Sequence, residues 1–310
     1  MIISIRGKDI EKAADVTALL SAMTAVVKSK KTLALQLTGF EEPSVIDKLV
    51  GRILKDNRLN ETFKMYQDDG IDAISVRSET MDLTKEHFDQ TVTSVLEKQN
   101  LFDVLKPTNK KEFYDFVKPE FIKNLLSGAK AVYDYIYVLL PENTSIIKMV
   151  NEYADENIVV VPQGPVEQFD EIDTAKTSYI IEDFESESIY KTKIATKGYG
   201  TKRVFELPHN YQYRDALIQQ TLFDFVRRNK SDIKEDDNYT FTASVMKLLT
   251  SYVSGKDEEE DETEELPDLP ENDAFEEPDN IDDIPDDAVQ EITVKKGIFG
   301  KKEKRFTADL

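Results

Sequence analysis

Three residues near the start of the chain could bind an anion: they are Gly7, Lys8 and Lys12. They stand between an apolar run at 2–5 and a helical pattern over 10–27. A glycine lets the backbone approach a ligand, lysines supply positive charge, and the N–H groups of a helix N-terminus attract phosphate. Asp9 and Glu11 occupy the same turn, so the alternative is an ordinary strand-to-helix turn with Asp9 as the helix cap.

A second group of charged residues is the pair Arg214 and Asp215, which follow Pro208 and open a helical pattern. An arginine beside a carboxylate can form a local ion pair and cap. A ligand contact by this pair is implied only by the family resemblance given below.

The central stretch 133–163 predicts the elements that would position these groups. Its two apolar runs, 135–140 and 158–161, are rich in β-branched and aromatic residues, and each is closed by a proline. Such runs are typical of buried parallel strands. Asn143 or Thr144 can cap a helix between them, so the stretch predicts a β-α-β unit.

The rest of the chain repeats this alternation. Further strands are expected at 2–5, 32–37, 71–76 and 101–105, with edge strands at 178–181 and 203–207. Further helices are expected at 10–27, 43–53, 84–96, 113–132 with a break at Pro119, 215–228 and 241–252. The pattern predicts one α/β domain over 1–255, with a doubly wound, mostly parallel sheet.

Two stretches resemble a known family, the ParA/MinD-type partitioning and positioning ATPases, which includes the ATPase-like proteins of Flp (Tad) pilus and conjugation gene clusters. The residues 133–138 read YDYIYV, the run at 158–163 ends in VVVPQ, and Pro208 is followed by YRDA at 213–216. The resemblance covers about 1–254. It implies the P-loop NTPase-like fold, and it places Gly7, Lys8, Lys12, Arg214 and Asp215 at the position of a nucleotide site.

The chain departs from the family at three places. The turn at 6–12 has one glycine, Leu139 stands where the family has a magnesium-associated acid, and 36–40 has no acid. We therefore expect no catalytic residue, no metal ligand and no cofactor, in a non-hydrolysing scaffold or positioning protein of a pilus, secretion or conjugation apparatus. The alternatives are an ATPase that uses ATP and magnesium, with Lys8 or Lys12 on phosphate, and an interaction protein that acts through an acidic tail.

Composition limits the chemistry further. The chain has no cysteine, which excludes disulfides and thiolate metal sites, and its two histidines are far apart. The net charge of −21 is concentrated in 257–291, which holds 19 acidic residues and no basic one. We expect 256–310 to be a disordered tail.

Partners and location follow from the same composition. The remaining folded part is only mildly acidic, which neither favours nor excludes most protein partners and argues against direct nucleic-acid binding. We expect protein partners, while the oligomeric state stays open. The basic segment 295–306 contains Phe299 and Phe306, which predicts weak membrane contact or partner docking; a solubilising end is the alternative. The chain starts without a basic leader and has no apolar run of membrane-spanning length, so we expect a cytoplasmic protein.

Overall fold

The computed structural model describes residues 1–38, 45–49, 70–95, 101–108, 110, 113–115, 117–170, 172–230 and 238–253. The chain divides into two compact units, Met1–Glu258 and Glu259–Leu310, and every described residue belongs to the first. The predicted boundary at 255, the disordered tail at 256–310 and the contact segment 295–306 lie outside the described residues.

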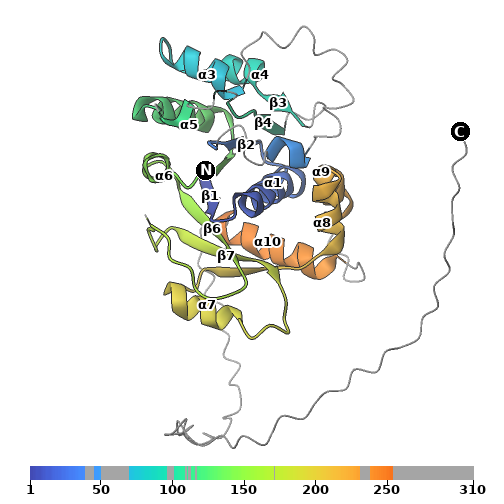
Figure 1. Ribbon diagram of the computed structural model, residues 1–310. Coiled ribbons are helices and arrows are strands. Elements are labelled where there is room, and N and C mark those ends of the chain that lie inside the picture. Colours follow the sequence, from blue (N-terminus) through green and yellow to red (C-terminus); the bar gives the residue numbers. More distant parts are fainter. Residues whose placement is uncertain are drawn as a thin grey trace, which may run out of the picture. The chain divides into compact units, whose positions relative to one another are not determined.

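The described strands form one sheet in the order β3-β4-β2-β5-β1-β6-β7-β8 (Figure 1). Their bounds are β1 Ile2–Gly7, β2 Thr32–Gln36, β3 Thr93–Ser94, β4 Phe102–Leu105, β5 Tyr135–Leu139, β6 Glu156–Pro162, β7 Thr177–Phe184 and β8 Val204–Pro208. Every neighbouring pair is parallel except β3 and β4. The predicted mostly parallel sheet is confirmed.

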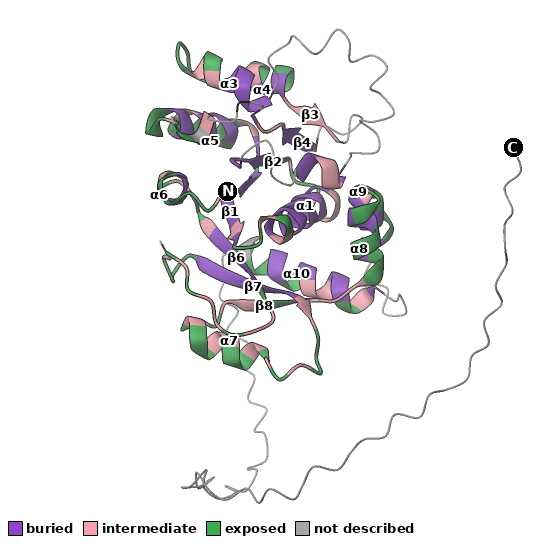
Figure 2. Ribbon diagram, in the orientation of Figure 1, coloured by how far each residue is buried: buried purple, intermediate pink, exposed green. Residues whose placement is uncertain are grey.

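The helices pack on both faces of this sheet. Their bounds are α1 Ile10–Val27, α3 Gly70–Ser78, α4 Lys85–Thr91, α5 Pro119–Val132, α6 Thr144–Asn151, α7 Thr192–Tyr199, α8 Tyr211–Ile218, α9 Leu222–Arg228 and α10 Tyr239–Val253, with a short 3-10 helix at Phe113–Asp115. Residues 45–49 are also helical. One apolar core lies under α1, α8, α9 and α10, and a second lies under α3, α4, α5 and α6 (Figures 1 and 2).

The centre of the sheet is the predicted β-α-β unit with β1 inserted in it. Ile5 of β1 is in register with Leu139 of β5 on one side and with Ile158 of β6 on the other. The helix between these two strands is α6, and the side chain of Asn143 accepts hydrogen bonds at its N-terminus. Strands β2, β5, β1 and β6 are thus adjacent and parallel, as predicted.

Helix α1 is almost wholly buried between the sheet and the helices α9 and α10. Small residues let it lie close to the strands, and its buried hydroxyls find partners. Thr17 Oγ1 donates to the carbonyl of Ala13, and the hydroxyls of Thr24 and Tyr137 are 2.6 Å apart. Buried polar groups of this kind are stable only when they are hydrogen-bonded, and these bonds fix α1 over β5.

The strand expected at 71–76 is wrong, because these residues belong to helix α3. Ile71 and Ile74 are fully buried whereas Val76 is 56% exposed, a spacing that suits a helix with one apolar face. Gly70 begins the helix with φ +62, and a Cβ there would lie 2.6 Å from the carbonyl oxygen of Lys106. A short apolar run of this kind fits either a strand or a helix in sequence. In the structure it is a helix whose start packs against the backbone at Lys106.

Two expected helices are shorter than predicted. Helix α4 ends at Thr91, and Thr93–Ser94 pairs with β4 instead of continuing the helix to 96. The single helix expected over 215–228 is split into α8 and α9, and Gln220 at the corner has φ +58. Ile218, expected on the buried face, is 75% exposed as a result.

Of the two predicted edge strands, one is at the edge of the sheet and the other is internal. Strand β8 is the edge, but β7 pairs with both β6 and β8. Strand β7 runs beyond the predicted 178–181 to Phe184, so the acids Glu182 and Asp183 belong to the strand.

Candidate functional site

The turn between β1 and α1 contains only Lys8 and Asp9. Gly7 is the last residue of β1, and a Cβ at this position would lie 2.9 Å from the carbonyl oxygen of Val160 in β6. The glycine is therefore required for close packing within the sheet. A two-residue turn also leaves no backbone with which to surround a phosphate group.

The N-terminus of α1 is occupied by the protein's own carboxylate. The side chain of Asp9 accepts hydrogen bonds from the backbone N–H groups of Glu11 at 3.0 Å and Lys12 at 3.2 Å. These are the donors that would hold an anion at a helix N-terminus. Asp9 is thus the helix cap that the sequence offered as one of two interpretations.

Lys12 points away from this turn and lies against the end of β7. Its Nζ is 3.0 Å from Glu182 Oε1 and 2.9 Å from Asp183 Oδ2, and His209 Nδ1 lies 3.2 Å from the other oxygen of Asp183. We call these four residues the Lys12 cluster. The ammonium group that could have contacted a phosphate is already shared by two carboxylates.

Burial and hydrogen bonding act in opposite directions within the Lys12 cluster. Glu182 is 6% exposed, and burial raises its pKa to about 7 although the hydrogen bond from Lys12 opposes the shift. Burial alone would raise the pKa of Asp183, but the hydrogen bond from Lys12 holds it below its ordinary value. Burial alone would lower the pKa of Lys12, yet its bonds to Asp183 and Glu182 raise it. Lys12 is therefore charged at neutral pH.

A second ion-pair group fixes the next turn of α1. Lys48 Nζ is 2.8 Å from Asp15 Oδ1 and 3.0 Å from Glu11 Oε1. Burial raises the pKa of Asp15, and the hydrogen bond from Lys48 opposes that shift. Glu11 and Asp15, the two acids in the first turns of α1, therefore share an ion pair with Lys48.

The two strand ends that carry acids in the resembled family carry other residues here. Leu139, the last residue of β5, is fully buried in the apolar core under α1. Gln36, the last residue of β2, is 1% exposed, and its side chain donates to Thr38 Oγ1 and accepts from the backbone N–H of Val45. Neither strand end presents a carboxylate that could hold magnesium.

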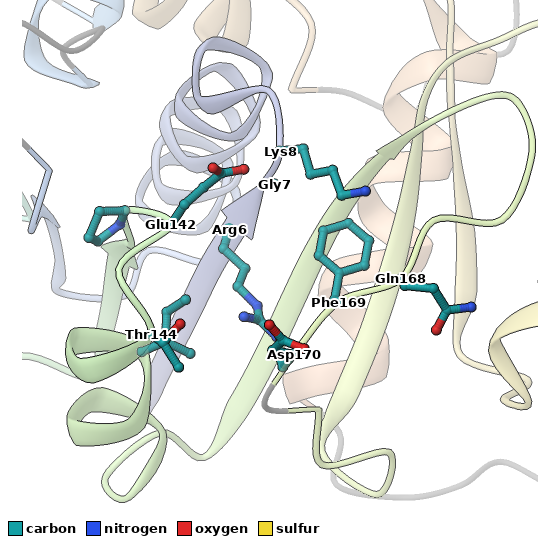
Figure 3. Close-up of a pocket in the computed structure, with 10 residues that line it drawn as sticks. Arg6, Gly7, Lys8, Glu142, Thr144, Gln168, Phe169 and Asp170 are labelled. Carbon is teal, nitrogen blue, oxygen red and sulfur yellow. The ribbon is translucent and has the colours of Figure 1, made fainter.

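A hollow of about 210 Å³ opens on the other side of the β1–α1 turn (Figure 3). It is lined by Arg6, Gly7, Lys8, Pro141, Glu142, Thr144, Ile147, Gln168, Phe169 and Asp170. We call it the switch-point hollow, because the connection from β1 to β2 and that from β5 to β6 leave this place in opposite directions. In open α/β sheets ligands bind at this point, beyond the carboxyl ends of the strands.

The switch-point hollow has an aromatic wall between two cations. Arg6 donates to the backbone carbonyl of Asp170, and its guanidinium carbon lies 5.9 Å from the centre of the Phe169 ring. Lys8 Nζ lies 5.5 Å from the same ring. Figure 3 shows Phe169 between these two side chains, with Glu142 and Asp170 supplying negative charge nearby. The hollow is therefore mixed in charge.

The structure separates the residues of the predicted nucleotide site. Gly7 and Lys8 border the switch-point hollow, while Lys12 belongs to the Lys12 cluster. Arg214 and Asp215 are exposed on α8, whose N-terminus is capped by the side chain of Asn210. The assignment of these residues to a nucleotide site stays a prediction.

Several residues of the site were not found from the sequence. Glu182, Asp183 and His209 come from the ends of β7 and β8, and Phe169 comes from the segment after β6. A pair of acids directly after the apolar run at 178–181 was the available signal, since the carboxyl ends of parallel strands meet at one edge of the sheet.

Metal and membrane elements were also sought in the described ranges. Within them, no three histidine or acidic side chains are grouped so that they could hold a metal ion. No helix in this part of the chain has the length and apolar character needed to span a bilayer.

Solved structures of similar fold were found by comparison. A ParA family ATPase from Chlorobium tepidum TLS has a TM-score of 0.59 and 15% identity, over 80% of this chain and 98% of its own. The cell division ATPase MinD of Pyrococcus furiosus has a TM-score of 0.54 and 14% identity, over 82% and 98%. The septum site-determining protein MinD of Pyrococcus horikoshii OT3, solved with Mg-ADP, has a TM-score of 0.52 and 13% identity, over 82% and 97%.

No protein-family model and no curated protein sequence matches the chain. At these identities the structural likeness establishes the fold alone. The chain has the ParA/MinD-type fold, which the sequence resemblance implied.

Proposed function

We propose that this chain uses the ParA/MinD-type fold as a non-hydrolysing scaffold that binds protein partners. The observation that carries the proposal is the hydrogen bonding of Asp9, whose carboxylate takes the backbone donors at the N-terminus of α1. Phosphoryl transfer depends on a backbone cradle, a lysine on the transferred group and a bound magnesium ion. Here Asp9 takes the backbone donors, Lys12 is bound by two carboxylates, and Leu139 and Gln36 stand at the strand ends where magnesium ligands would be expected.

The charges around the turn support the same conclusion. A phosphate brought to the N-terminus of α1 would meet the carboxylates of Asp9 and Glu11, and it would have to displace Glu182 and Asp183 from Lys12. Repulsion between like charges is stronger inside a partly buried site than in water, so these carboxylates oppose the binding of a phosphate. Leu139 and Gln36 offer magnesium no carboxylate in compensation.

The experiment is nucleotide binding and phosphate release by the purified full-length protein with magnesium and ATP, with and without the products of neighbouring genes. We expect no saturable binding and no turnover above background. Saturable, magnesium-dependent binding that disappears in Lys8→Ala or in Lys12→Ala would support the alternative, an ATPase with an unconventional phosphate loop.

A matched pair of variants makes the negative result informative. Asp9→Asn keeps a capping side chain and removes the charge, whereas Asp9→Gly removes the cap and frees the backbone donors. If nucleotide affinity rises in Asp9→Gly and not in Asp9→Asn, the bonds of Asp9 are what excludes the anion. The same binding in all three proteins would contradict that explanation.

The cellular setting of the scaffold is a further part of the proposal. Resemblance of the sequence to the ATPase-like proteins of pilus and conjugation clusters supports a role in a pilus, secretion or conjugation apparatus. Removal of 256–310 tests which part binds the partner. Retained binding places the contact on the folded domain, and complete loss assigns it to 256–310.

A further inference from the structure

Helix α7 and its flanking turns form a basic surface that carries exposed isoleucines. We call it the α7 surface and define it by Ile189, Lys193, Ile194, Lys197 and Lys202, all of which are exposed. No residue of α7 is buried, and the helix lies beyond β7 and β8 at one end of the sheet (Figures 1 and 2). The proposed scaffold function does not account for this surface.

The α7 surface is basic, but acids border it. The segment 188–205 contains five basic residues and no acidic one, whereas Glu185, Glu187 and Glu206 lie just outside it and Thr192 donates to Glu206. Arg203 is engaged by Glu156, and Lys191 donates to a backbone carbonyl. Within the described residues, the three lysines of the α7 surface form no side-chain hydrogen bond or ion pair. They therefore present three charges to whatever approaches.

The apolar residues stand among these charges. Ile189 is 78% exposed and Ile194 is 47% exposed, which is unusual for isoleucine. Lys193 and Lys197 are one helical turn apart on the same side of α7, and Ile194, the residue after Lys193, lies about 100° further round the helix. Lysine around an apolar tip is the pattern of an element that enters the headgroup region of a bilayer, where ammonium groups reach anionic lipid.

The helix is held in this orientation by its inner side. The ring of Tyr199 stacks on that of Tyr179 with centroids 3.9 Å apart, and a Cβ on Gly198 would lie 2.1 Å from a methyl carbon of Val166. Gly200, with φ +66, ends the helix in the left-handed conformation. Rotation of α7 to bury Ile194 would break these contacts, so they hold Ile194 at the surface; Ile189 lies in the turn before the helix.

We propose that the α7 surface binds an anionic lipid surface. A peptide ligand would need a groove for its side chains, but the hollow beside Ile194 and Tyr199 encloses only about 10 Å³, room for a single water molecule. The cations are lysines, whose ammonium groups act as point charges toward headgroups and do not form the forked pairs of arginine. This contact is separate from the one expected for 295–306.

The experiment is co-sedimentation of the full-length protein with vesicles. One set is pure phosphatidylcholine, and the other contains about a third phosphatidylserine. We expect binding to the anionic vesicles alone, with Lys193→Glu/Lys197→Glu lowering the partition coefficient at least about 20-fold, since each lysine near the surface contributes about fivefold. Ile189→Ser and Ile194→Ser should each lower it roughly threefold to tenfold.

The matched control is Lys85→Glu/Lys123→Glu, which gives the same net charge by changing two exposed lysines on α4 and α5. It should bind as the unaltered protein does. The proposal is overturned if the unaltered protein does not bind anionic vesicles, or if the α7 double variant binds as well as this control. It is also overturned if the lysine changes abolish binding and the isoleucine changes have no effect. The surface would then bind polyanions in general, such as nucleic acid or an acidic protein.

Discussion

The two sides of the β1–α1 turn use lysines four residues apart in different ways. On one side, Lys12 has two carboxylate oxygens within 3.0 Å, and one of those carboxylates also meets His209. On the other side, Lys8 lies over the ring of Phe169 beside an open hollow. The same residue type is thus closed into the fold at one position and exposed beside a hollow at the other.

The difference comes from what the neighbouring segments supply. Strand β7 ends in two acids that are partly or wholly removed from water, so a cation must accompany them. The segment after β6 supplies an aromatic ring and a backbone carbonyl, which interact with a cation without neutralising it. Charges matched at short distance hold the fold together, and those left unmatched are available to ligands.

The largest effect expected from this comparison is the loss of Lys12. Lys12→Ala leaves Glu182 buried without its cation, and removal of one partner from such a pair is strongly destabilising. Because Lys12 itself is 32% exposed, we expect a loss of about 2 kcal/mol in the free energy of unfolding, measured by urea denaturation. Combining it with Glu182→Gln should restore part of the loss. A loss under about 0.5 kcal/mol, the range of ordinary surface changes, would mean that the Lys12 cluster does not stabilise the fold.

The second effect is a pH dependence with opposite signs at neighbouring carboxyls. Burial raises the pKa of Glu182 from 4.5 to about 7. The folded state therefore keeps a proton that the unfolded chain has released, and the contribution of Glu182 to stability falls as pH rises from 4.5 to 7. We expect this dependence, about 1–3 kcal/mol in size, to disappear in Glu182→Gln.

Asp183 provides the contrast to Glu182. Burial opposes it, but the hydrogen bond from Lys12 lowers its pKa, so its contribution is present above the unfolded pKa and is lost as pH falls. Asp183→Asn should therefore destabilise the protein at neutral pH and have less effect in acid. Unfolding curves across this range would count against the assignment if both variants changed with pH in the same direction.

The third effect concerns the cap between the two lysines. Asp9→Ala removes the acceptor for the N–H groups of Glu11 and Lys12, which should cost about 1 kcal/mol of stability. Asp9→Asn keeps an acceptor and should cost a few tenths at most. Equal losses in the two variants, measured by thermal unfolding, would show that charge and not the cap stabilises this end of α1.

The smallest effect is expected on the open side. Lys8 is exposed, and its contact with Phe169 is a surface cation–π interaction. Lys8→Ala should change stability by no more than about 0.5 kcal/mol. A loss as large as that of Lys12→Ala would remove the distinction between the two sides.

The elements at the centre of this comparison could be predicted from the sequence. The runs at 135–140 and 158–161 are short, apolar and closed by prolines, and few structures other than buried parallel strands fit that pattern. Asp9 and Asn143 were found as caps because a short polar side chain before a helical pattern has a defined local role. Local chemistry was sufficient for these residues.

Residues whose role depends on distant strands were not found. The acids Glu182 and Asp183 look like the start of a loop in sequence, and only the strand order brings them to Lys12, 170 residues earlier. Phe169 lies in a segment without periodicity, so nothing in the sequence relates it to Arg6. The helix at 70–78 was missed for a related reason, since its helical state depends on contact with Lys106.

The position of β1 has a consequence for how the chain reaches this structure. β1 is synthesised well before both of its neighbours, β5 and β6, which lie in 135–162. Until these residues leave the ribosome, β1 has neither of its sheet partners and α1 lacks most of its core. Contacts so far apart in sequence form slowly, because a long loop must close before they are made. A nascent chain that stalls before residue 135 should therefore expose apolar surface to chaperones, whereas one from which 135–162 has already left the ribosome can complete the centre of the sheet.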